Sequence, residues 1–449
     1  MTSKQQKEEL LKKDEKYLWH AMKKYNPEGT MIAQKAEGVW ITDIDGNRYL
    51  DGQAGLWCVN VGYGRDELAD AAAKQLREMP YYPLTQSHIP GIQLSEKLNQ
   101  WLDDDYVIFF SNSGSEANET AFKIARQYYQ QIGKANKTKF ISRYRSYHGN
   151  SFATLAAGGQ NQRAYKYEPL TPGFVHVSPP DCYRSPFSDE KDRCCILAAN
   201  EIDKTITWEI SDTVAGIIME PIITGGGILI PHNSYFERVS EICDKHDVLL
   251  ICDEVINGFG RTGKPFGFMH YNLKPDIITM AKGLTSGYLP LAATAVKREI
   301  YEAFQDAEND YSHFRHINTF GGSPASCTVA IRNLEIMEQE KLIENSAKLG
   351  EKLYEALLTL KDHPYVGDIR GGKGLLLGIE FVKDKETKEP NEVFAAQVVS
   401  RCKEKGVIIG KTSDTVPGYN NIVTMSPPLS ITQDELQLLI HTIVDVVYH

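Results

Sequence analysis

Two stretches of the chain decide the fold: Val248-Leu-Leu-Ile-Cys-Asp-Glu-Val-Ile256 and Asp276-Ile-Ile-Thr-Met-Ala-Lys-Gly-Leu-Thr-Ser-Gly-Tyr-Leu-Pro290. Each contains a continuous apolar run, which is typical of a strand buried in a parallel sheet. The first run ends at the carboxylate of Asp253, and the second is followed by Lys282 and Gly283. Because ligands bind at the carboxyl ends of parallel strands, we expect this acid and this amine to meet in one site.

An amine and an acid at neighbouring strand ends indicate one particular cofactor. A lysine can bond to the aldehyde of pyridoxal phosphate (PLP), and a carboxylate can hold the pyridine nitrogen protonated, so that the ring accepts a substrate's electrons. Taken singly, Asp253 could cap a strand end and Lys282 could be a surface lysine with a buried stem. We expect PLP chemistry because phosphate-binding and aromatic motifs precede them in the chain.

The phosphate-binding motif is Ser111-Asn-Ser-Gly-Ser-Glu-Ala-Asn-Glu119, which follows the strand-like residues 106–110 and opens a helix. Small residues let backbone amides approach a phosphate, and a helix N-terminus attracts an anion. We expect Ser113, Gly114 and Ser115 to form the cradle. The alternative is a helix N-cap without a ligand.

Two further strand ends carry candidate residues. Tyr147 and His148 end the segment that starts at Phe140, and an aromatic ring there can stack on a flat cofactor, unless it is simply a loop tyrosine. Glu220 ends the strand-like residues 217–219 and either orders the polar groups of the site or caps the next turn.

Other cofactor motifs are absent or misplaced in the sequence. Residues 258–263 match Gly-x-Gly-x-x-Gly, but they begin several residues beyond a strand and open no helix, so a nicotinamide site is not expected. The sequence lacks a complete Gly-x-x-x-x-Gly-Lys-[Ser/Thr] phosphate loop, a Gly-x-Ser-x-Gly elbow and a His-Glu-x-x-His pair.

Composition narrows the class of protein. The chain has 449 residues, 42% of them hydrophobic, which is too many for one small domain. Its net charge of −10 argues against binding to nucleic acid or to an anionic membrane. None of its eight cysteines forms a Cys-x-x-Cys pair, so we expect no metal site. We find no signal peptide and no apolar run of membrane-spanning length, and we expect a cytoplasmic protein.

We expect three segments: residues 1–75 join a small domain, residues 76–330 form a large cofactor-binding domain, and residues 331–449 complete the small α+β domain. The first contains a hairpin within residues 38–52. The second alternates helices and strands, as in a parallel sheet covered on both faces. The expected strands are 106–110, 139–142, 215–219, 248–252, 276–281 and 374–382, and the expected helices are 115–131, 234–245, 324–339, 345–359 and the segment after 432.

Taken together, these motifs resemble the class III (omega) aminotransferases, which are fold-type I PLP enzymes. The resemblance extends from about Trp19 to the C-terminus. It rests on residues 55–64, 111–119, 147–149, 220–221, 253–263, 281–287 and 318–320. It implies a mostly parallel seven-stranded sheet sandwiched by helices, with a smaller α+β domain built from N- and C-terminal segments. It also implies ping-pong transfer of an amino group from a small-molecule amine donor to a keto-acid acceptor.

The resemblance assigns a role to each matching residue. Lys282 would bind the cofactor and move the substrate proton, and Asp253 would pair with the ring nitrogen. Val255 would pack on one face of the ring and Tyr147 on the other. Gly114 and Ser115 would bind the phosphate, with Ser113, His148 and Glu220 also in the cofactor site. Thr319 would reach the phosphate of a neighbouring subunit, which implies a homodimer or a dimer of dimers. The substrate pocket would contain Trp57, Met22 and Tyr82.

The substrate prediction rests on finer likenesses. Residues 55–64, 314–322 and 417–421 look most like the omega-amino acid or taurine:pyruvate branch. Members of that branch often carry a carboxylate-binding arginine before the C-terminal Pro-Pro, but residues 410–428 contain none, and Lys411 is the nearest cation. Diaminopelargonate (biotin-pathway) and 4-aminobutyrate aminotransferases remain alternatives, as does a non-catalytic relative that keeps the fold.

Overall fold

The computed structural model describes residues 3–188, 190–306 and 308–449. Its centre is a seven-stranded sheet in the order β4-β10-β9-β8-β7-β5-β6. Within it β10 runs antiparallel to both neighbours, and the strands from β9 to β6 pair in parallel. The mostly parallel seven-stranded sheet is therefore confirmed. Its strands are β4 (Tyr106–Ser111), β5 (Lys139–Arg143), β6 (Phe174–Val177), β7 (Val214–Met219), β8 (Leu249–Asp253), β9 (Ile277–Met280) and β10 (Ala292–Lys297).

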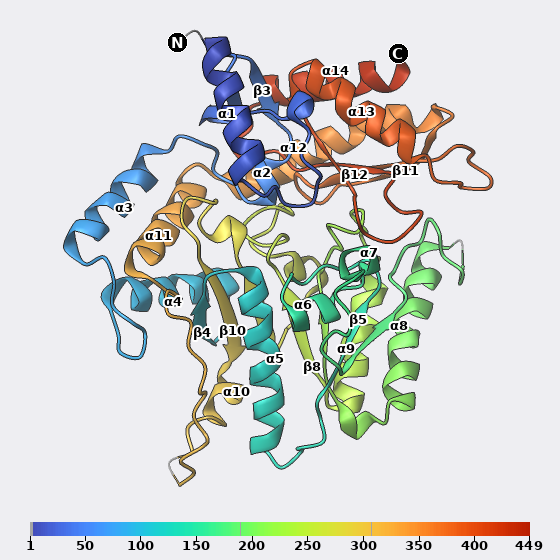
Figure 1. Ribbon diagram of the computed structural model, residues 1–449. Coiled ribbons are helices and arrows are strands. Elements are labelled where there is room, and N and C mark those ends of the chain that lie inside the picture. The colour runs from blue at the N-terminus through green and yellow to red at the C-terminus, as the bar shows by residue number, and fades with distance from the viewer. Residues whose placement is uncertain (1–2, 189, 307) are drawn as a thin grey trace.

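Helices cover both faces of this sheet, because its strands are apolar on both sides. Leu250 and Cys252 of β8 belong to the core that contains the buried faces of α8 (Lys191–Trp208) and α9 (Asn233–His246). Leu249 and Ile251, which alternate with them, pack with α5 (Gly114–Gln131) on the other face. Figure 1 shows α5 near β4 and β10 in the view, with α8 and α9 towards β5.

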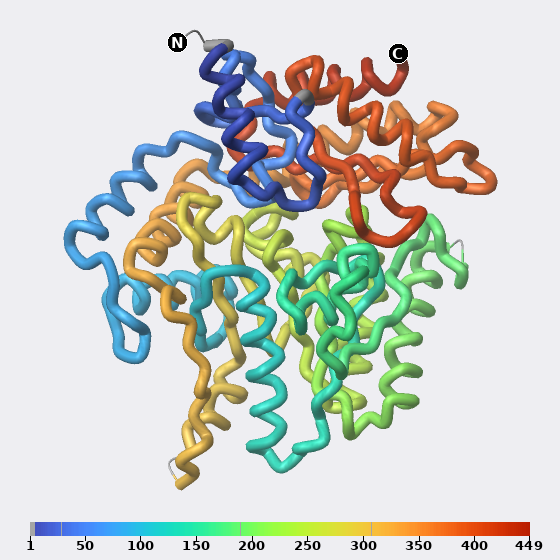
Figure 2. Tube along the Cα trace, in the orientation of Figure 1, coloured from blue at the N-terminus to red at the C-terminus, as the bar shows by residue number. Residues whose placement is uncertain are grey.

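Two smaller sheets lie against this layer. One joins β1 (Ala33–Glu37), β2 (Trp40–Asp43) and β3 (Arg48–Asp51) to β13 (Val407–Ile408), and the other has the order β11-β12-β15-β14. The β2–β3 hairpin is the predicted one. Since β13 pairs with β3, the two ends of the chain share a sheet. Figure 2 shows these segments on the same side of the molecule. The second sheet contains β11 (Val366–Arg370), β12 (Leu377–Phe381), β14 (Gly410–Lys411) and β15 (Ile422–Met425).

The remaining helices agree with the sequence patterns wherever a helix was expected. α11 spans the predicted range 324–339. α12 begins at Leu342, three residues before the start predicted for that helix. In the described part of the chain, no helix combines the length and the apolar character that a membrane crossing requires. The other helices are α1 (Ser3–Tyr17), α2 (Ala54–Trp57), α3 (Asp66–Glu78), α4 (Ile89–Leu102), α6 (Phe152–Ala157), α7 (Asn161–Ala164), α10 (Arg298–Glu302), α11 (Pro324–Gln339), α12 (Leu342–Leu357), α13 (Glu392–Glu404) and α14 (Gln433–Tyr448).

Candidate active site

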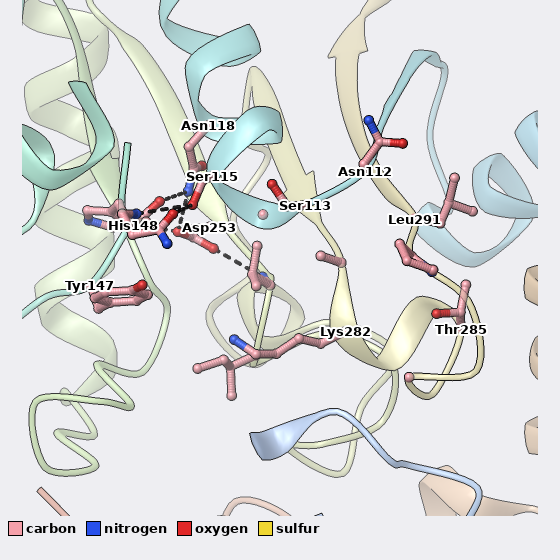
Figure 3. A pocket seen from close by; sticks show the side chains of 18 of the residues that line it. Asn112, Ser113, Ser115, Asn118, Tyr147, His148, Asp253, Lys282, Thr285 and Leu291 are labelled. Carbon is pink, nitrogen blue, oxygen red and sulfur yellow. Dashed lines mark hydrogen bonds and ion pairs between the residues drawn. The ribbon is translucent and has the colours of Figure 1, made fainter. Parts of the chain in front are cut away.

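A cavity of about 400 Å³ lies at the carboxyl ends of the parallel strands. Asp253 is the last residue of β8, Glu220 follows β7, and Lys282 lies two residues beyond β9. In Figure 3, Lys282 extends towards the side of the cavity where Tyr147 and Asp253 lie. The predicted residues that line this cavity are Ser113, Gly114, Ser115, Tyr147, His148, Glu220, Asp253, Val255 and Lys282.

The Lys282 amine is available for reaction. Its backbone adopts a left-handed conformation (φ 45°), which is uncommon for a residue other than glycine. The turn also needs Gly283, since a Cβ there would lie 2.4 Å from Nδ2 of Asn60. Burial lowers the pKa of Lys282 below its ordinary value, although the charge of Asp253 opposes the shift. A larger share of the amine is therefore neutral and nucleophilic near pH 7.

A buried network fixes the Asp253 carboxylate. Asp253 is 3% exposed. Its Oδ2 atom accepts a hydrogen bond from Nδ2 of Asn118 (2.9 Å) and is paired with Nδ1 of His148 (2.8 Å), and its Oδ1 atom accepts one from the Val255 amide (3.1 Å). Asn118 is itself oriented by Thr279, whose hydroxyl donates to its Oδ1 atom (2.8 Å). These contacts leave the carboxylate in one orientation beside the cavity.

The N-terminus of α5 forms a cradle of small residues. Ser113 is the N-cap, and its hydroxyl accepts a hydrogen bond from the first turn. The Ser115 hydroxyl donates to Oδ1 of Asn150 (3.0 Å) and accepts from its amide (3.1 Å). A Cβ on Gly114 would lie 2.9 Å from Cγ2 of Val255, so only glycine leaves this space open. The cradle has the amides and the helix dipole that bind a phosphate.

Glu220 holds the loop that carries Tyr147. The carboxylate accepts hydrogen bonds from the Tyr147 amide (3.1 Å), from the Thr224 amide (3.0 Å) and from the Thr224 hydroxyl (2.7 Å). It is 2% exposed, and this burial raises its pKa. Of the two interpretations of Glu220, the contacts favour an acid that orders the site.

The predicted substrate residues are spread more widely. Trp57 is near Tyr147, because a Cβ on Gly225 would lie 3.9 Å from Cζ3 of Trp57 and 3.8 Å from Cβ of Tyr147. Tyr82 and Thr319 do not line this cavity. A role for either residue there would require a second subunit.

Lys411 lies in β14 and already has two partners. Its Nζ atom donates to the carbonyls of Thr412 (2.9 Å) and Asn420 (2.8 Å). These bonds compete with any carboxylate for its ammonium group, and burial lowers the pKa of Lys411.

The sequence patterns missed two residues, Asn118 and Arg163. Asn118 lies inside α5, and a polar residue within a helix is ordinarily predicted to lie on the exposed face. Arg163 lies in the short helix α7, and its guanidinium carbon is 5.2 Å from the centre of the Tyr147 ring. Its Nη1 atom is 3.4 Å from the Met22 sulfur, which brings the predicted Met22 to the same place. No local signal marks either residue, because both act through contacts between distant segments.

The residues present fit PLP. The cavity offers an amine for the aldehyde of this cofactor and a fixed carboxylate for its ring nitrogen. The cradle at the start of α5 suits its phosphate. Gly114 contributes to this fit, because a Cβ there would lie 2.9 Å from Cγ2 of Val255, which lines the same cavity.

Comparisons with known proteins agree with this site. A family model described as aminotransferase class-III matches residues 21–447. The chain is 63% identical over 440 residues to the uncharacterised aminotransferase YhxA of Bacillus subtilis, covering 98% of this chain and 96% of YhxA. It is 44% identical over 438 residues to the taurine–pyruvate aminotransferase of Bilophila wadsworthia, covering 97% and 96%. A solved Bacillus anthracis aminotransferase superposes with a TM-score of 0.96 at 60% identity, covering 100% and 99%.

The chain belongs to the class III aminotransferases. It is a PLP-dependent enzyme of fold type I that transfers amino groups, as its family implies.

Proposed function

We propose that this enzyme moves an amino group from an omega-amino acid or amine, of the taurine or β-alanine type, to pyruvate or a similar keto acid. The 44% identity to a taurine–pyruvate aminotransferase supports this choice. So does the Gly55-Leu-Trp-Cys-Val-Asn60 segment, which resembles that branch of the family.

Each cavity residue has a part in this proposal. When bound, PLP accepts the substrate's electrons and stores the amino group between the two half-reactions. Lys282 anchors it and then moves the proton at the substrate carbon. Asp253 keeps the ring nitrogen protonated, while Val255 and Tyr147 hold the two faces of the ring. Gly114 and Ser115 hold the phosphate.

The observation that carries the substrate class is the Arg163 cation beside the cavity. An omega-amino acid has an anionic group at the end away from its amine, and this group needs a cation near the cavity mouth. Arg163 packs over Tyr147, close to Met22. Its Nε atom donates to Oε1 of Gln160 (2.7 Å) and its Nη2 atom to the Ser413 carbonyl (3.2 Å), but a guanidinium has five N–H groups, more than these contacts use. A guanidinium binds a carboxylate or sulfonate through two parallel hydrogen bonds, which the Lys411 ammonium cannot do.

Arg163→Leu tests this assignment. We expect kcat/KM for taurine and β-alanine to fall about 10- to 100-fold, because a hydrogen bond to a charged group contributes about 1.5–3 kcal/mol. With propylamine, which has no anionic end, the value should change less than about threefold. Arg163→Lys should recover part of the loss. An equal loss with propylamine and taurine would show that Arg163 only supports Tyr147.

The main alternatives predict other substrates. A diaminopelargonate aminotransferase would convert 7-keto-8-aminopelargonate, and a 4-aminobutyrate enzyme would prefer 4-aminobutyrate to taurine. A single-turnover screen of the donors, followed by either pyruvate or 7-keto-8-aminopelargonate as the acceptor, separates these activities. A non-catalytic relative would convert none of them.

We also propose that the enzyme is a cytoplasmic homodimer or dimer of dimers in which Thr319 reaches the neighbouring site. Three observations support a partner: Thr319 is exposed, Ile89 and Ile92 are 70% and 60% exposed, and Phe320 is 65% exposed. Light scattering that gives a monomer at working concentration would overturn this assembly. Eight free cysteines suit a reducing cytoplasm.

The segment boundaries expected from sequence remain part of the proposal. We propose that residues 76–330 act as the large cofactor domain, with residues 1–75 and 331–449 as the small one. The parallel pairing of β13 with β3 supports a small domain built from both the N-terminal and the C-terminal segments.

A further inference from the structure

Three of the eight cysteines lie together at the β6 edge of the molecule, outside the candidate active site. Cys194 and Cys195 lie in α8, and both are buried. Cys182 lies in the segment between β6 and α8 and is half-buried. Cys194 directly precedes Cys195 in α8, and the Cys195 sulfur contacts that of Cys182, so the three residues form one cluster.

The sulfurs of Cys182 and Cys195 are already in contact, at 3.5 Å. A disulfide bond is about 2.05 Å long, so closing one requires a movement of about 1.5 Å. Cys195 is fixed, because it is 0% exposed in an 18-residue helix that packs on α9. Cys182 is in a segment without regular structure between residues 178 and 188, so this side can supply the movement.

The surroundings distinguish the two thiols. Cys182 is the only one of the cluster with more than 1% exposure, so a small oxidant can reach it first. The Cys195 sulfur accepts a hydrogen bond from the His232 amide (3.3 Å), which stabilises negative charge on that sulfur. Among the described residues, no group of three or more Cys, His, Asp or Glu has the geometry to hold a metal ion. The cluster is therefore better suited to thiol oxidation than to metal binding.

The other cysteines lack these features. The pair Cys182 and Cys195 is distinguished by a sulfur–sulfur contact at 3.5 Å. Cys327 and Cys402 are each 0% exposed, so an oxidant in solution has no direct access to either thiol. Cys58 is half-buried, and its thiol donates to the carbonyl of Ala54.

We propose that Cys182 and Cys195 are a hydroperoxide-sensitive pair that forms a reversible intramolecular disulfide. The Cys182 sulfur attacks the hydroperoxide, the O–O bond breaks, and a sulfenic acid and an alcohol form, the alcohol taking the thiol proton. The Cys195 sulfur then attacks the sulfur of Cys182, and the S–O bond breaks as water leaves with the second thiol proton. Two thiols are thereby oxidised to one disulfide, and the hydroperoxide is reduced to alcohol and water.

The test treats the PLP-loaded enzyme with hydrogen peroxide and counts free thiols after denaturation. The count should fall from eight to about six and return after a dithiol reductant is added. Mass spectrometry of a non-reduced digest should find the Cys182 peptide joined to the Cys194–Cys195 peptide. Cys182→Ser and Cys195→Ser should abolish this cross-link, and Cys194→Ser, the matched control, should keep it.

Three results would overturn the proposal. One is a constant count of eight thiols at peroxide concentrations that oxidise glutathione. Another is conversion of Cys182 to sulfinic acid without a cross-link. The third is loss of the cross-link in Cys194→Ser. Because Cys195 is buried, its variant could fail to fold, but Cys182→Ser changes a half-buried loop residue and keeps the test decisive.

Discussion

Replacing Asp253 by asparagine removes one charge from the cavity and changes the shape of the side chain little. The asparagine side-chain oxygen could still accept from the Val255 amide, as Asp253 does at 3.1 Å. Two unit charges about 4 Å apart interact by about 4 kcal/mol at an effective dielectric constant of about 20. If Asp253 uses this energy to keep the cofactor nitrogen protonated, its loss lowers the rate about 1000-fold, at about 1.4 kcal/mol for each factor of ten.

The assay is the single-turnover rate with taurine, measured alongside the cofactor content of the purified variant. We expect Asp253→Asn to keep the cofactor and lose the rate. Asp276→Asn is the matched control, because Asp276 accepts from the Leu250 amide (2.8 Å) and pairs with Lys297 (2.8 Å) at the opposite end of the same strands. The reasoning is refuted if cofactor-loaded Asp253→Asn retains more than about a tenth of the wild-type rate.

Three further predictions concern the cradle, the core and the acceptor. Gly114→Ala should weaken cofactor binding more than about tenfold in a titration, because the alanine Cβ would lie 2.9 Å from Val255. An affinity equal to that of the wild type would show that the cradle adjusts freely. Glu380→Gln should lower the free energy of unfolding by about 3–5 kcal/mol in urea, since Glu380 is 0% exposed and pairs with Arg184 and Arg370. A loss below about 1 kcal/mol would contradict the strength of that network. Lys411→Ala should raise the KM for pyruvate if Lys411 binds the acceptor, and an unchanged KM would remove it from the site.

The parallel sheet and the positions of its functional ends could be predicted from sequence. The apolar runs that became β7, β8 and β9 are short, and each is followed by a polar residue at the site. In a parallel sheet such residues must share an edge, so Glu220, Asp253 and Lys282 were predicted to lie together, and all three line the cavity. The glycine at position 114 was likewise visible, because small residues at a helix start indicate close approach of a ligand.

The parts that escaped prediction depend on contacts between distant segments. Asn118 orients Asp253 across 135 residues of sequence, and Arg163 meets Met22 across 141. The periodicity of α5 and the length of α7 carry no sign of these partners. The contact between Cys182 and Cys195 joins residues 13 apart in the sequence, and no motif marks it.

The central claim is that Lys282 is the residue that binds the cofactor. Borohydride reduction of the PLP-loaded enzyme makes this bond permanent, and peptide mass spectrometry then locates it. We predict the phosphopyridoxyl mass on the peptide that contains Lys282, and no labelled peptide in Lys282→Ala, whose melting curve should remain cooperative. A label on another lysine, or none on a protein that still catalyses transamination, would contradict the account.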